Sequence, residues 1–366
     1  MKDNELFQDL FVLELANNHW GNVERGLKII ETYSRVVRFN NIKAAIKLQF
    51  RNVDTFIHKD FLQYKELRYI NKTLQTKLSK EEYRTLVNMV KKSGCLTMAT
   101  PFDETSVEWC REFDLDLIKI ASSDINDWIL IEAIAKLKKP VIASVGGSSL
   151  KDIDDLVSFF KKRHIPLAIN HCVSLYPVPK NQLELNQINY LKDRFPENVI
   201  GLSTHETNEF LDETIMLAYA KGARTFERHV DIEEGDYEVS PYCSLPEDID
   251  RVFKSYHRAV QLCGGAGSVY RVIPEPEIAY LDTLVRGVYA KSDLKAGHVL
   301  SDDDVYLAIP LQKGQISCRE LMRGEVLVND VSKDQKIMIQ DIDSPYSHSE
   351  KMRNFIMQRG VEVKDD

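Results

Sequence analysis

Eight short runs of β-branched and other apolar residues, separated by longer amphipathic segments, constrain the fold of this chain more than any other feature. The runs span residues 11–16, 44–50, 95–101, 117–123, 140–146, 167–173, 199–204 and 224–230. Between them apolar residues recur every three or four positions, as in SKEEYRTLVNMVKKSG (79–94), and this spacing is typical of amphipathic helices. Strands that alternate with helices form a parallel sheet, and eight such units predict an α/β fold with a closed (β/α)8 TIM barrel over residues 1–265.

A doubly wound open sheet is the alternative for the same alternation of strands and helices. Sheets of that kind that bind dinucleotides carry a G-x-G-x-x-G motif after the first strand. The first run here, FVLELA, continues into NNHWGN, which contains no such motif. We therefore favour the barrel.

The periodic pattern stops after residue 260. Glycine and proline cluster in QLCGGAGSVYRVIPEPE (261–277), which is typical of a connection between domains, and we place a linker at 266–280. Short apolar runs and turn residues then predict a small β-rich domain at 281–343. The remaining residues, 344–366, are polar and charged and are predicted to form a C-terminal tail, either a short helix or a partly disordered end.

The composition excludes several classes of function. The 366 residues carry a net charge of −8, so neither nucleic acid nor an anionic membrane surface is expected as a partner. No apolar run is long enough to span a bilayer, and the acidic start MKDNELFQDLF lacks the basic and apolar stretches of a signal peptide. The six cysteines are scattered without a C-x-x-C motif, which is typical of reduced thiols. We therefore expect a cytoplasmic protein.

Polar residues stand near the ends of most predicted strands, which is where a TIM barrel places its active site. They include Glu14, Lys47, Gln49, Thr100, Lys119, Ser122, Ser174, Tyr176, Ser203, His205 and His229.

Two of these residues, Lys47 and Lys119, are lysines inside apolar runs. Burying a lysine is costly without an anionic partner, and hydroxyl side chains of four of the other residues would lie at the same rim. A pocket for a phosphate or a carboxylate is therefore one interpretation of the two lysines. In the alternative, each lysine extends to solvent or pairs with a nearby carboxylate.

His205 and His229 end two consecutive predicted strands, which are neighbours in a barrel. Two imidazoles at one rim suit a catalytic divalent metal such as Mn²⁺, with water and substrate oxygens completing the coordination. Glu14, on the strand that would close the barrel beside His229, could be a further ligand, a base or an acceptor for a sugar hydroxyl. In the alternative, each histidine is a structural group satisfied by hydrogen bonds.

The residues around these positions form seven motifs in a fixed order. ELANNHWG, IKLQ, ATPFD, KIASSD, HCVSLYPVP, GLSTH and FERHV stand at the ends of predicted strands. In these motifs the chain, from about residue 11 to 343, resembles the sialic acid synthase family, enzymes that condense phosphoenolpyruvate (PEP) with an amino-sugar aldehyde. The segment 285–343, with DLKAGHVLSDDDV, is similar to the antifreeze-like (SAF) domain of that family.

The resemblance implies a metal-dependent condensation of PEP with an aldose, such as N-acetylmannosamine or a modified hexosamine, to give a sialic-acid-like nonulosonic acid and phosphate. It implies that PEP is held by Lys47, Gln49, Thr100, Lys119, Ser122, Ser174 and Ser203. It also implies that His205 and His229 bind Mn²⁺, or another divalent ion such as Mg²⁺ or Co²⁺. Catalytic roles are implied for Glu14, Tyr176 and Lys119. A homodimer in which each SAF domain covers the partner's site is implied as well.

Three positions depart from the pattern of that family. Thr204 stands where the family has an aspartate in G-x-S-D-H, and Ser240 stands where it has one in a P-G-P-D loop. Asp236 or Glu238 could substitute for the second aspartate. Ile309 stands where an arginine of the SAF domain reaches the N-acetyl group of the acceptor. Despite these departures, we still expect the chain to bind PEP and a metal ion. We expect its acceptor to differ from N-acetylmannosamine.

Two other functions stay open at this point. The loss of an acidic group near the metal would suit a non-catalytic protein that binds a sugar or PEP. A lyase on the same barrel, working through a Schiff base at Lys47 or Lys119, is the other alternative.

Overall fold

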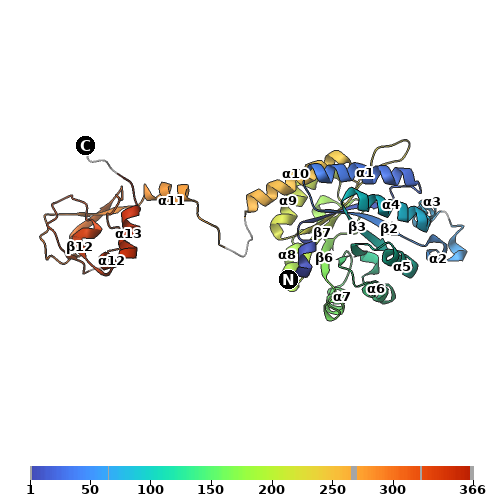
Figure 1. The fold of residues 1–366 in the computed structure, drawn as a ribbon, viewed down its shortest axis with the longest axis horizontal. Helices are drawn as coiled ribbons and strands as arrows, with labels where there is room; N and C mark the ends of the chain where they lie inside the picture. Colours follow the sequence, from blue (N-terminus) through green and yellow to red (C-terminus); the bar gives the residue numbers. More distant parts are fainter. Residues whose placement is uncertain (1, 65, 265–269, 322–323, 363–366) are drawn as a thin grey trace. The chain divides into compact units, whose positions relative to one another are not determined.

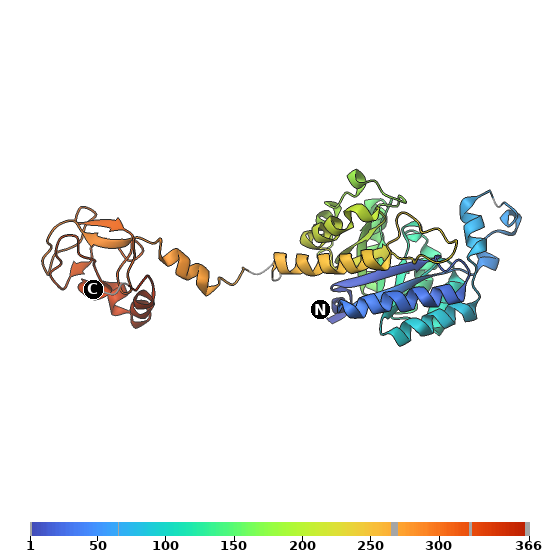
Figure 2. The same ribbon diagram turned by 90° about the horizontal axis from the view of Figure 1, so that it is seen from above.

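The structure is a computed structural model that describes residues 2–64, 66–264, 270–321 and 324–362. The chain divides into two compact units, unit 1 (residues 1–264) and unit 2 (residues 265–366). Both are drawn as ribbons in Figure 1 and Figure 2.

Eight parallel strands close into a barrel in unit 1, in the order in which they occur along the chain. They are β1 (Leu10–Ala16), β2 (Ala44–Phe50), β3 (Leu96–Pro101), β4 (Leu117–Ile120), β5 (Val141–Ser144), β6 (Leu167–Cys172), β7 (Val199–Thr204) and β8 (Thr225–His229). Each strand coincides with one of the eight predicted runs to within three residues at either end. The predicted TIM barrel is therefore confirmed.

Helices connect the strands and surround the barrel (Figure 1). Before and between the first five strands these are η1 (Lys2–Phe7), α1 (Val23–Phe39), α2 (Val53–Phe56), η2 (Lys59–Phe61), α3 (Arg68–Gln75), α4 (Lys80–Ser93), α5 (Glu104–Glu112), η3 (Ser122–Asp124) and α6 (Trp128–Ala135). After β5 come α7 (Leu150–Lys162), η4 (Lys180–Gln182), α8 (Gln187–Arg194), η5 (Asn208–Phe210), α9 (Leu211–Lys221) and α10 (Pro246–Cys263). The apolar faces of these helices pack on the outward-facing residues of the strands and form the main core.

Local signals in the sequence determine where several helices begin and end. The Ser79 side chain accepts a hydrogen bond from the backbone of Glu82, and the Glu82 side chain bonds the Ser79 backbone, so α4 begins with a capping box. The same helix ends at Gly94, whose φ of +84° is the left-handed conformation that glycine adopts at little cost.

Alternation along the strands separates an outward and an inward face. Phe11, Leu13 and Leu15 of β1 belong to the outer core with the helices, whereas Leu10 and Val12 point into the barrel. The inward residues near the start of the strands form a second apolar cluster that also includes Phe7 of η1. Because this cluster fills one end of the barrel, the inward positions further along each strand are left to line the other end.

The three elements between β2 and α4 form a projection that the other connections lack. Figure 2 shows α2, η2 and α3, in light blue, extending beyond the ring of helices. α3 carries Arg68 at its first position and Lys72 one turn later. This segment therefore adds side chains to the barrel from outside the strand ends.

Unit 2 is built around short antiparallel pairs. Its elements are α11 (Glu275–Asp282), β9 (Gly287–Ala290), β10 (Val305–Ala308), β11 (Val326–Leu327), η6 (Ile339–Asp341), β12 (Ile342–Asp343), α12 (Pro345–His348) and α13 (Glu350–Gln358). β9 pairs with β10 and β11 with β12, and a separate apolar core lies among them. Ile309, directly after β10, is 59% exposed.

The predicted polar tail contains helices. Residues 345–358 form α12 and α13, and Ile356 is fully buried in the core of unit 2. The guanidinium of Arg359 pairs with Glu320 at 2.7 Å, and both side chains are buried. Of the two forms expected for the tail, the structure therefore shows the helical one, and one apolar residue and one ion pair attach this otherwise polar segment. Of the predicted linker at 266–280, residues 266–269 lie outside the described part, and α11 occupies residues from Glu275 onward.

Among the described residues, no helix combines the length and the apolar character that crossing a membrane requires. The six cysteines are free thiols; Cys263 and Cys318 are exposed and the other four are buried.

The fold generates a prediction about the middle of the barrel. A Cβ atom added at Gly201 of β7 would lie 1.8 Å from Thr225 Oγ1 and 2.4 Å from Asn170 Oδ1. We expect Gly201→Ala to lower the free energy of unfolding of unit 1 by about 2–3 kcal/mol, because the strands around it must shift. Urea titration followed by tryptophan fluorescence measures this, since Trp20, Trp109 and Trp128 all lie in unit 1.

The matched control is Gly94→Ala. There the added methyl group meets no atom within 4 Å, so only the cost of a positive φ remains, about 1 kcal/mol. If Gly201→Ala lowers the free energy of unfolding no more than Gly94→Ala does, the strands around Gly201 separate easily.

Candidate active site

A cavity of about 670 Å³ opens at the C-terminal ends of the barrel strands. Its walls contain every residue that the sequence analysis placed in the site. These are Glu14, Lys47, Gln49, Thr100, Lys119, Ser122, Ser174, Tyr176, Ser203, His205 and His229. The structure therefore brings all of them together, from seven different strands or the loops that follow them.

Lys47 lies among carboxylates at the inner end of the cavity. The register pairs Glu14 of β1 with Lys47 of β2 on one side and with His229 of β8 on the other. The ammonium of Lys47 forms an ion pair with Glu14, lies 3.5 Å from Glu227 Oε1, and donates to Thr100 Oγ1 at 3.0 Å. The alternative that this lysine pairs with a carboxylate is thus correct for Lys47.

Burial and charge act against each other in this cluster. Burial lowers the pKa of Lys47 to about 8, although Glu227 favours the charged ammonium. Burial alone would raise the pKa of Glu227, but the ammonium groups of Lys119 and Lys47 outweigh it and hold the pKa below its usual value. We conclude that Glu227 is ionised at neutral pH and compensates buried positive charge.

Lys119 lies in a different environment, among hydroxyl groups, and the charge of Glu227 acts on it only from beyond ion-pair distance. Its ammonium donates to Ser144 Oγ at 2.7 Å and to the Ile120 carbonyl at 2.9 Å. Among the described residues no carboxylate oxygen comes within 4 Å of it. The Gly146 N–H nearby donates to Ser122 Oγ at 3.1 Å.

Gly146 leaves room beside these groups. A Cβ atom at this position would lie 2.4 Å from Ser174 Oγ and 3.1 Å from Ser122 Oγ. We call Lys119, Ser122, Ser144, Gly146 and Ser174 the β4–β6 cradle. An ammonium, three hydroxyls and a backbone N–H around one small space are the groups that bind a phosphate or a carboxylate.

The rings of the two histidines lie close together in the cavity wall. The ring centroids of His205 and His229 are 5.3 Å apart, and the Tyr176 ring lies 4.1 Å from that of His205. Burial lowers the pKa of His205 to about 4 and that of His229 well below its usual value. Both imidazoles are therefore neutral, which is the form that binds metal ions.

These two residues fit a divalent metal as a pair of nitrogen donors. His205 Nδ1 lies 3.3 Å from the Val173 carbonyl oxygen, which leaves its Nε2 for another partner. No group of three or more His, Cys, Asp or Glu side chains is arranged for a metal ion in the part of the chain that the structure describes. Water and substrate would have to supply the other ligands.

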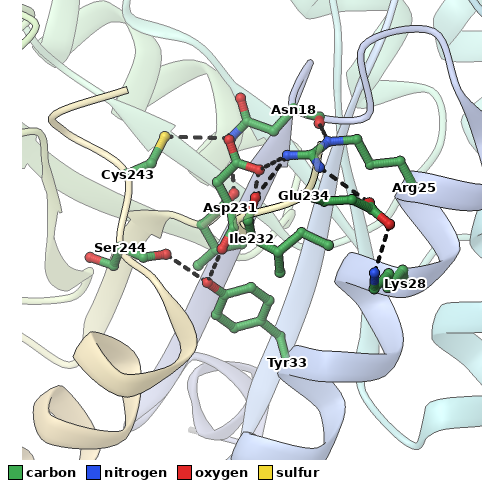
Figure 3. Close-up of polar contacts among 10 residues, drawn as sticks. Asn18, Arg25, Lys28, Tyr33, Asp231, Ile232, Glu234, Cys243 and Ser244 are labelled. Atoms are coloured by element: carbon green, nitrogen blue, oxygen red, sulfur yellow. Dashed lines mark hydrogen bonds and ion pairs between the residues drawn. The ribbon is translucent and has the colours of Figure 1, made fainter. Parts of the chain in front are cut away.

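A polar network holds the loop after β8 against α1 (Figure 3). The buried guanidinium of Arg25 donates to Asp231 Oδ1 at 2.6 Å. The Tyr33 hydroxyl lies 2.6 Å from the carbonyl oxygens of both Asp231 and Ser244. The loop thereby fixed carries Tyr242, whose ring lines the cavity 5.3 Å from that of His229.

The same loop does not deliver a carboxylate to the cavity. Asp236 and Glu238 are exposed, and neither is among the residues that line it. The carbonyl of Ser240 accepts the N–H of Cys243 at 2.8 Å, and its side chain also lies outside the lining. Neither Asp236 nor Glu238 therefore lines the cavity in place of the missing aspartate.

Thr204 is also turned away from the cavity. Since Ser203 and His205 line it, the residue between them faces the opposite side. Its hydroxyl bonds the carboxylate of Glu206, which lies 3.4 Å from the guanidinium of Arg228. This buried network links the ends of β7 and β8 behind the two histidines.

The sequence analysis assigned no role to several lining residues. They are Ala16, Asn17, Asn18, Arg51, Arg68, Tyr69, Lys72, Phe102, Ala121, Ser123, Ser144, Gly146, Cys172, Glu227 and Tyr242. Strand alternation could have identified Ser144, because it continues the inward face of its strand. No sequence signal indicates that α3 turns toward the cavity.

Two family models match the chain. Residues 40–267 match the NeuB family, and residues 285–343 match the SAF domain.

Known proteins resemble most of the chain. A solved structure from Chromobacterium violaceum, described as a spore coat polysaccharide biosynthesis protein E, has a TM-score of 0.88 and 36% identity. It covers 92% of this chain and 100% of that one. N-acetylneuraminic acid synthetase from Leptospira borgpetersenii has a TM-score of 0.64 and 28% identity, covering 75% of this chain and 91% of that one. Pseudaminic acid synthase from Campylobacter jejuni is 29% identical over 80% of this chain and 85% of its own length.

The charge cluster generates a prediction about stability. We expect Lys47→Met, which keeps the volume, to lower the free energy of unfolding at pH 7 by about 3–5 kcal/mol, because two buried carboxylates lose their nearest counter-charge. Urea titration with tryptophan fluorescence measures the loss. The loss should shrink below pH 5, where these carboxylates can take up protons in the variant.

Lys59→Met is the control, because Lys59 is exposed and lies outside the cavity. If Lys47→Met is as stable as this control, the lysine does not compensate the carboxylates.

Proposed function

Because the chain belongs to the NeuB family, we propose that it is a transferase that condenses PEP with an aldose to form a nonulosonic acid and phosphate. The observation that carries the proposal is the juxtaposition, in one cavity, of the β4–β6 cradle, a buried lysine–carboxylate cluster and two neutral imidazoles. Relatives named pseudaminic acid synthase and N-acetylneuraminic acid synthetase support the reaction class. A cavity of about 670 Å³ has room for both substrates.

PEP would lie with its phosphate in the β4–β6 cradle. There Lys119 has no carboxylate partner of its own among the described residues, so an anion would complete its environment. The PEP carboxylate would be held by the remaining donors of the predicted set: Lys47, Gln49, Thr100 and Ser203.

His205 and His229 would hold a divalent ion such as Mn²⁺, and Mg²⁺ or Co²⁺ are the other candidates. When bound, such an ion supplies Lewis-acid polarisation of the acceptor's carbonyl group. Glu14 and Tyr176 line the cavity next to the two imidazoles and would orient the acceptor.

The reaction forms one carbon–carbon bond and breaks one carbon–oxygen bond. C3 of PEP attacks the aldehyde carbon, and the aldehyde oxygen becomes a hydroxyl. Water adds at C2 of the former PEP, and the resulting tetrahedral centre expels phosphate. Lys119 and the cradle hydroxyls would stabilise the phosphate as it leaves, and holding both substrates in one cavity lowers the entropic cost of their encounter.

The acceptor is expected to differ from N-acetylmannosamine. Ile309 stands where the family arginine would reach the N-acetyl group, and this side chain is exposed on unit 2. In a homodimer whose SAF domains cover the partner's cavity, it would lie near the acceptor. We therefore expect a modified hexosamine or another aldose.

A Schiff-base lyase is the second candidate, because the lowered pKa of Lys47 is a property of lysines that attack carbonyl groups. Borohydride reduction in the presence of pyruvate, followed by mass spectrometry, separates the two candidates. A covalent adduct on Lys47 or Lys119 would favour the lyase, whereas its absence favours condensation.

We predict that phosphate is released from PEP only when Mn²⁺ and an aldose are both present, and that His205→Ala lowers this rate by at least a hundredfold. The reason is that one of the two imidazole donors is lost. A phosphate assay over a panel of N-acetylmannosamine, 6-deoxyhexoses and diacetamido hexoses measures it, and circular dichroism checks that the variant is folded. Unchanged turnover after metal is removed with a chelator would contradict the metal assignment.

We also predict that Gly146→Ala raises the Kd for PEP by about tenfold or more. The methyl group would occupy the space between Ser122 and Ser174, where the phosphate is expected. Calorimetric titration with PEP measures this. Gly94→Ala is the control, since Gly94 ends α4 and lies outside the cavity. Equal affinity in the two variants would place the phosphate elsewhere.

A further inference from the structure

We propose that the acceptor sugar carries an anionic group, a phosphate monoester or a carboxylate, and that Arg51, Arg68 and Lys72 bind it on the α3 side of the cavity. The assignment of this group to the acceptor rests on the proposed function. We call these three residues the α3 cation cluster. All three line the cavity.

Arg51 is a buried cation whose partners are all neutral. Its side chain is 4% exposed, and its terminal nitrogens donate to Gln49 Oε1 at 2.9 Å, to the Tyr69 hydroxyl at 2.8 Å and to Asn17 Oδ1 at 3.4 Å. Its Nε is buried and has no hydrogen-bond partner among the described residues. A buried guanidinium without a counter-charge is costly, so an anionic ligand would stabilise it.

Arg68 and Lys72 add two positive charges next to Arg51. They are four residues apart on α3 and therefore lie on one face of the helix. Within the described residues, neither has a carboxylate oxygen within 4 Å, whereas Lys77 just beyond the helix pairs with Asp54 at 2.5 Å. The chain thus provides an ion-pair partner for the neighbouring lysine and none for the two that line the cavity.

The charges in the cavity are unevenly distributed. Five cationic and two anionic side chains line it, although the whole chain has a net charge of −8. Both carboxylates, Glu14 and Glu227, lie beside Lys47 at the inner end. Among the described residues, Asp231 and Asp124 act on Lys72 and Arg51 only from beyond ion-pair distance, and neither lines the cavity. The α3 cation cluster therefore has no ion-pair partner in the cavity, and a neutral sugar would leave it without one.

The cluster faces a different part of the cavity from the β4–β6 cradle. Arg51 follows β2, and the other two cations lie on the helix after it, whereas the cradle comes from β4, β5, β6 and their loops. In a closed eight-stranded barrel, β2 is four strands away from β6. One end of a sugar held at the two histidines would thus point toward the PEP phosphate in the cradle, and its other end toward α3.

Steady-state kinetics of the full chain with Mn²⁺ test the proposal. The acceptors are N-acetylmannosamine, its 6-phosphate and the corresponding 6-carboxylate, which share one ring and differ in charge. We expect an anionic acceptor to have a lower KM than N-acetylmannosamine. Comparison of the two anionic acceptors shows whether a phosphate or a carboxylate is preferred. Arg68→Gln and Lys72→Gln should each raise that KM about 10- to 100-fold and leave the KM for PEP within about twofold.

Two variants control for indirect effects. Lys59→Gln removes an exposed charge from the same projection without touching the cavity, and it should change neither KM. Arg68→Lys keeps the charge and should restore most of the affinity that Arg68→Gln loses. A structural role for Arg68 would not produce a shift limited to the anionic acceptor.

Three results would overturn the proposal. The first is equal KM values for the neutral and anionic acceptors, and the second is a KM for PEP that rises as much as that for the acceptor. If no acceptor in the series turns over, the wider aldose panel tests the proposed function, and calorimetric titration with the 6-phosphate decides on the subsite alone. If the 6-phosphate binds Arg68→Gln about tenfold more weakly than the unaltered protein, the proposal is supported. If it binds both equally, or binds neither detectably, that is the third result that would overturn the proposal.

Discussion

The ion pairs around Lys47 are the interaction on which the site depends. This lysine lies in the interior of a barrel, where a charge is stable only beside opposite charges and hydrogen-bonding groups. Glu14 and Glu227 provide the charges, and Thr100 provides the hydroxyl. Four strands therefore meet at one polar cluster, and the positions of Glu14 and Lys47 follow from the register of their strands.

The same alternation of side chains builds both ends of the barrel. In β1, Leu10 and Val12 point inward and help to fill one end, and Glu14, two residues further on, points inward at the other. In β4, Leu117 likewise points inward at the filled end, and Lys119, two residues further on, points inward at the cavity. The apolar end excludes water and anchors the strands, so the polar end can hold charges that would destabilise an ordinary core.

Elements outside the barrel complete the cavity. The loop after β8 is held to α1 by Arg25 and Tyr33, and it brings Tyr242 to the histidines. The helix α3 brings two further cations, Arg68 and Lys72, to the cavity. Variation of acceptor chemistry within one family is most easily accommodated in such peripheral elements, because the strands themselves are constrained by packing on both faces. If so, the strand ends determine the reaction, and the loops and α3 determine the acceptor.

The sequence by itself determined the barrel and its polar rim. Strand position, period-two alternation and the ends of the runs are local properties, and they were sufficient to predict Lys47, Lys119 and both histidines as members of one site. The tertiary structure alone decided which lysine is paired with carboxylates and which is not, because Glu14 and Glu227 reach Lys47 across strands that are distant in sequence. It also decided that Arg51, Arg68 and Lys72 share a cavity and that Asp236 and Glu238 do not enter it. Those outcomes depend on how loops and a short helix pack against the barrel, and contacts between distant segments leave no local pattern in the chain.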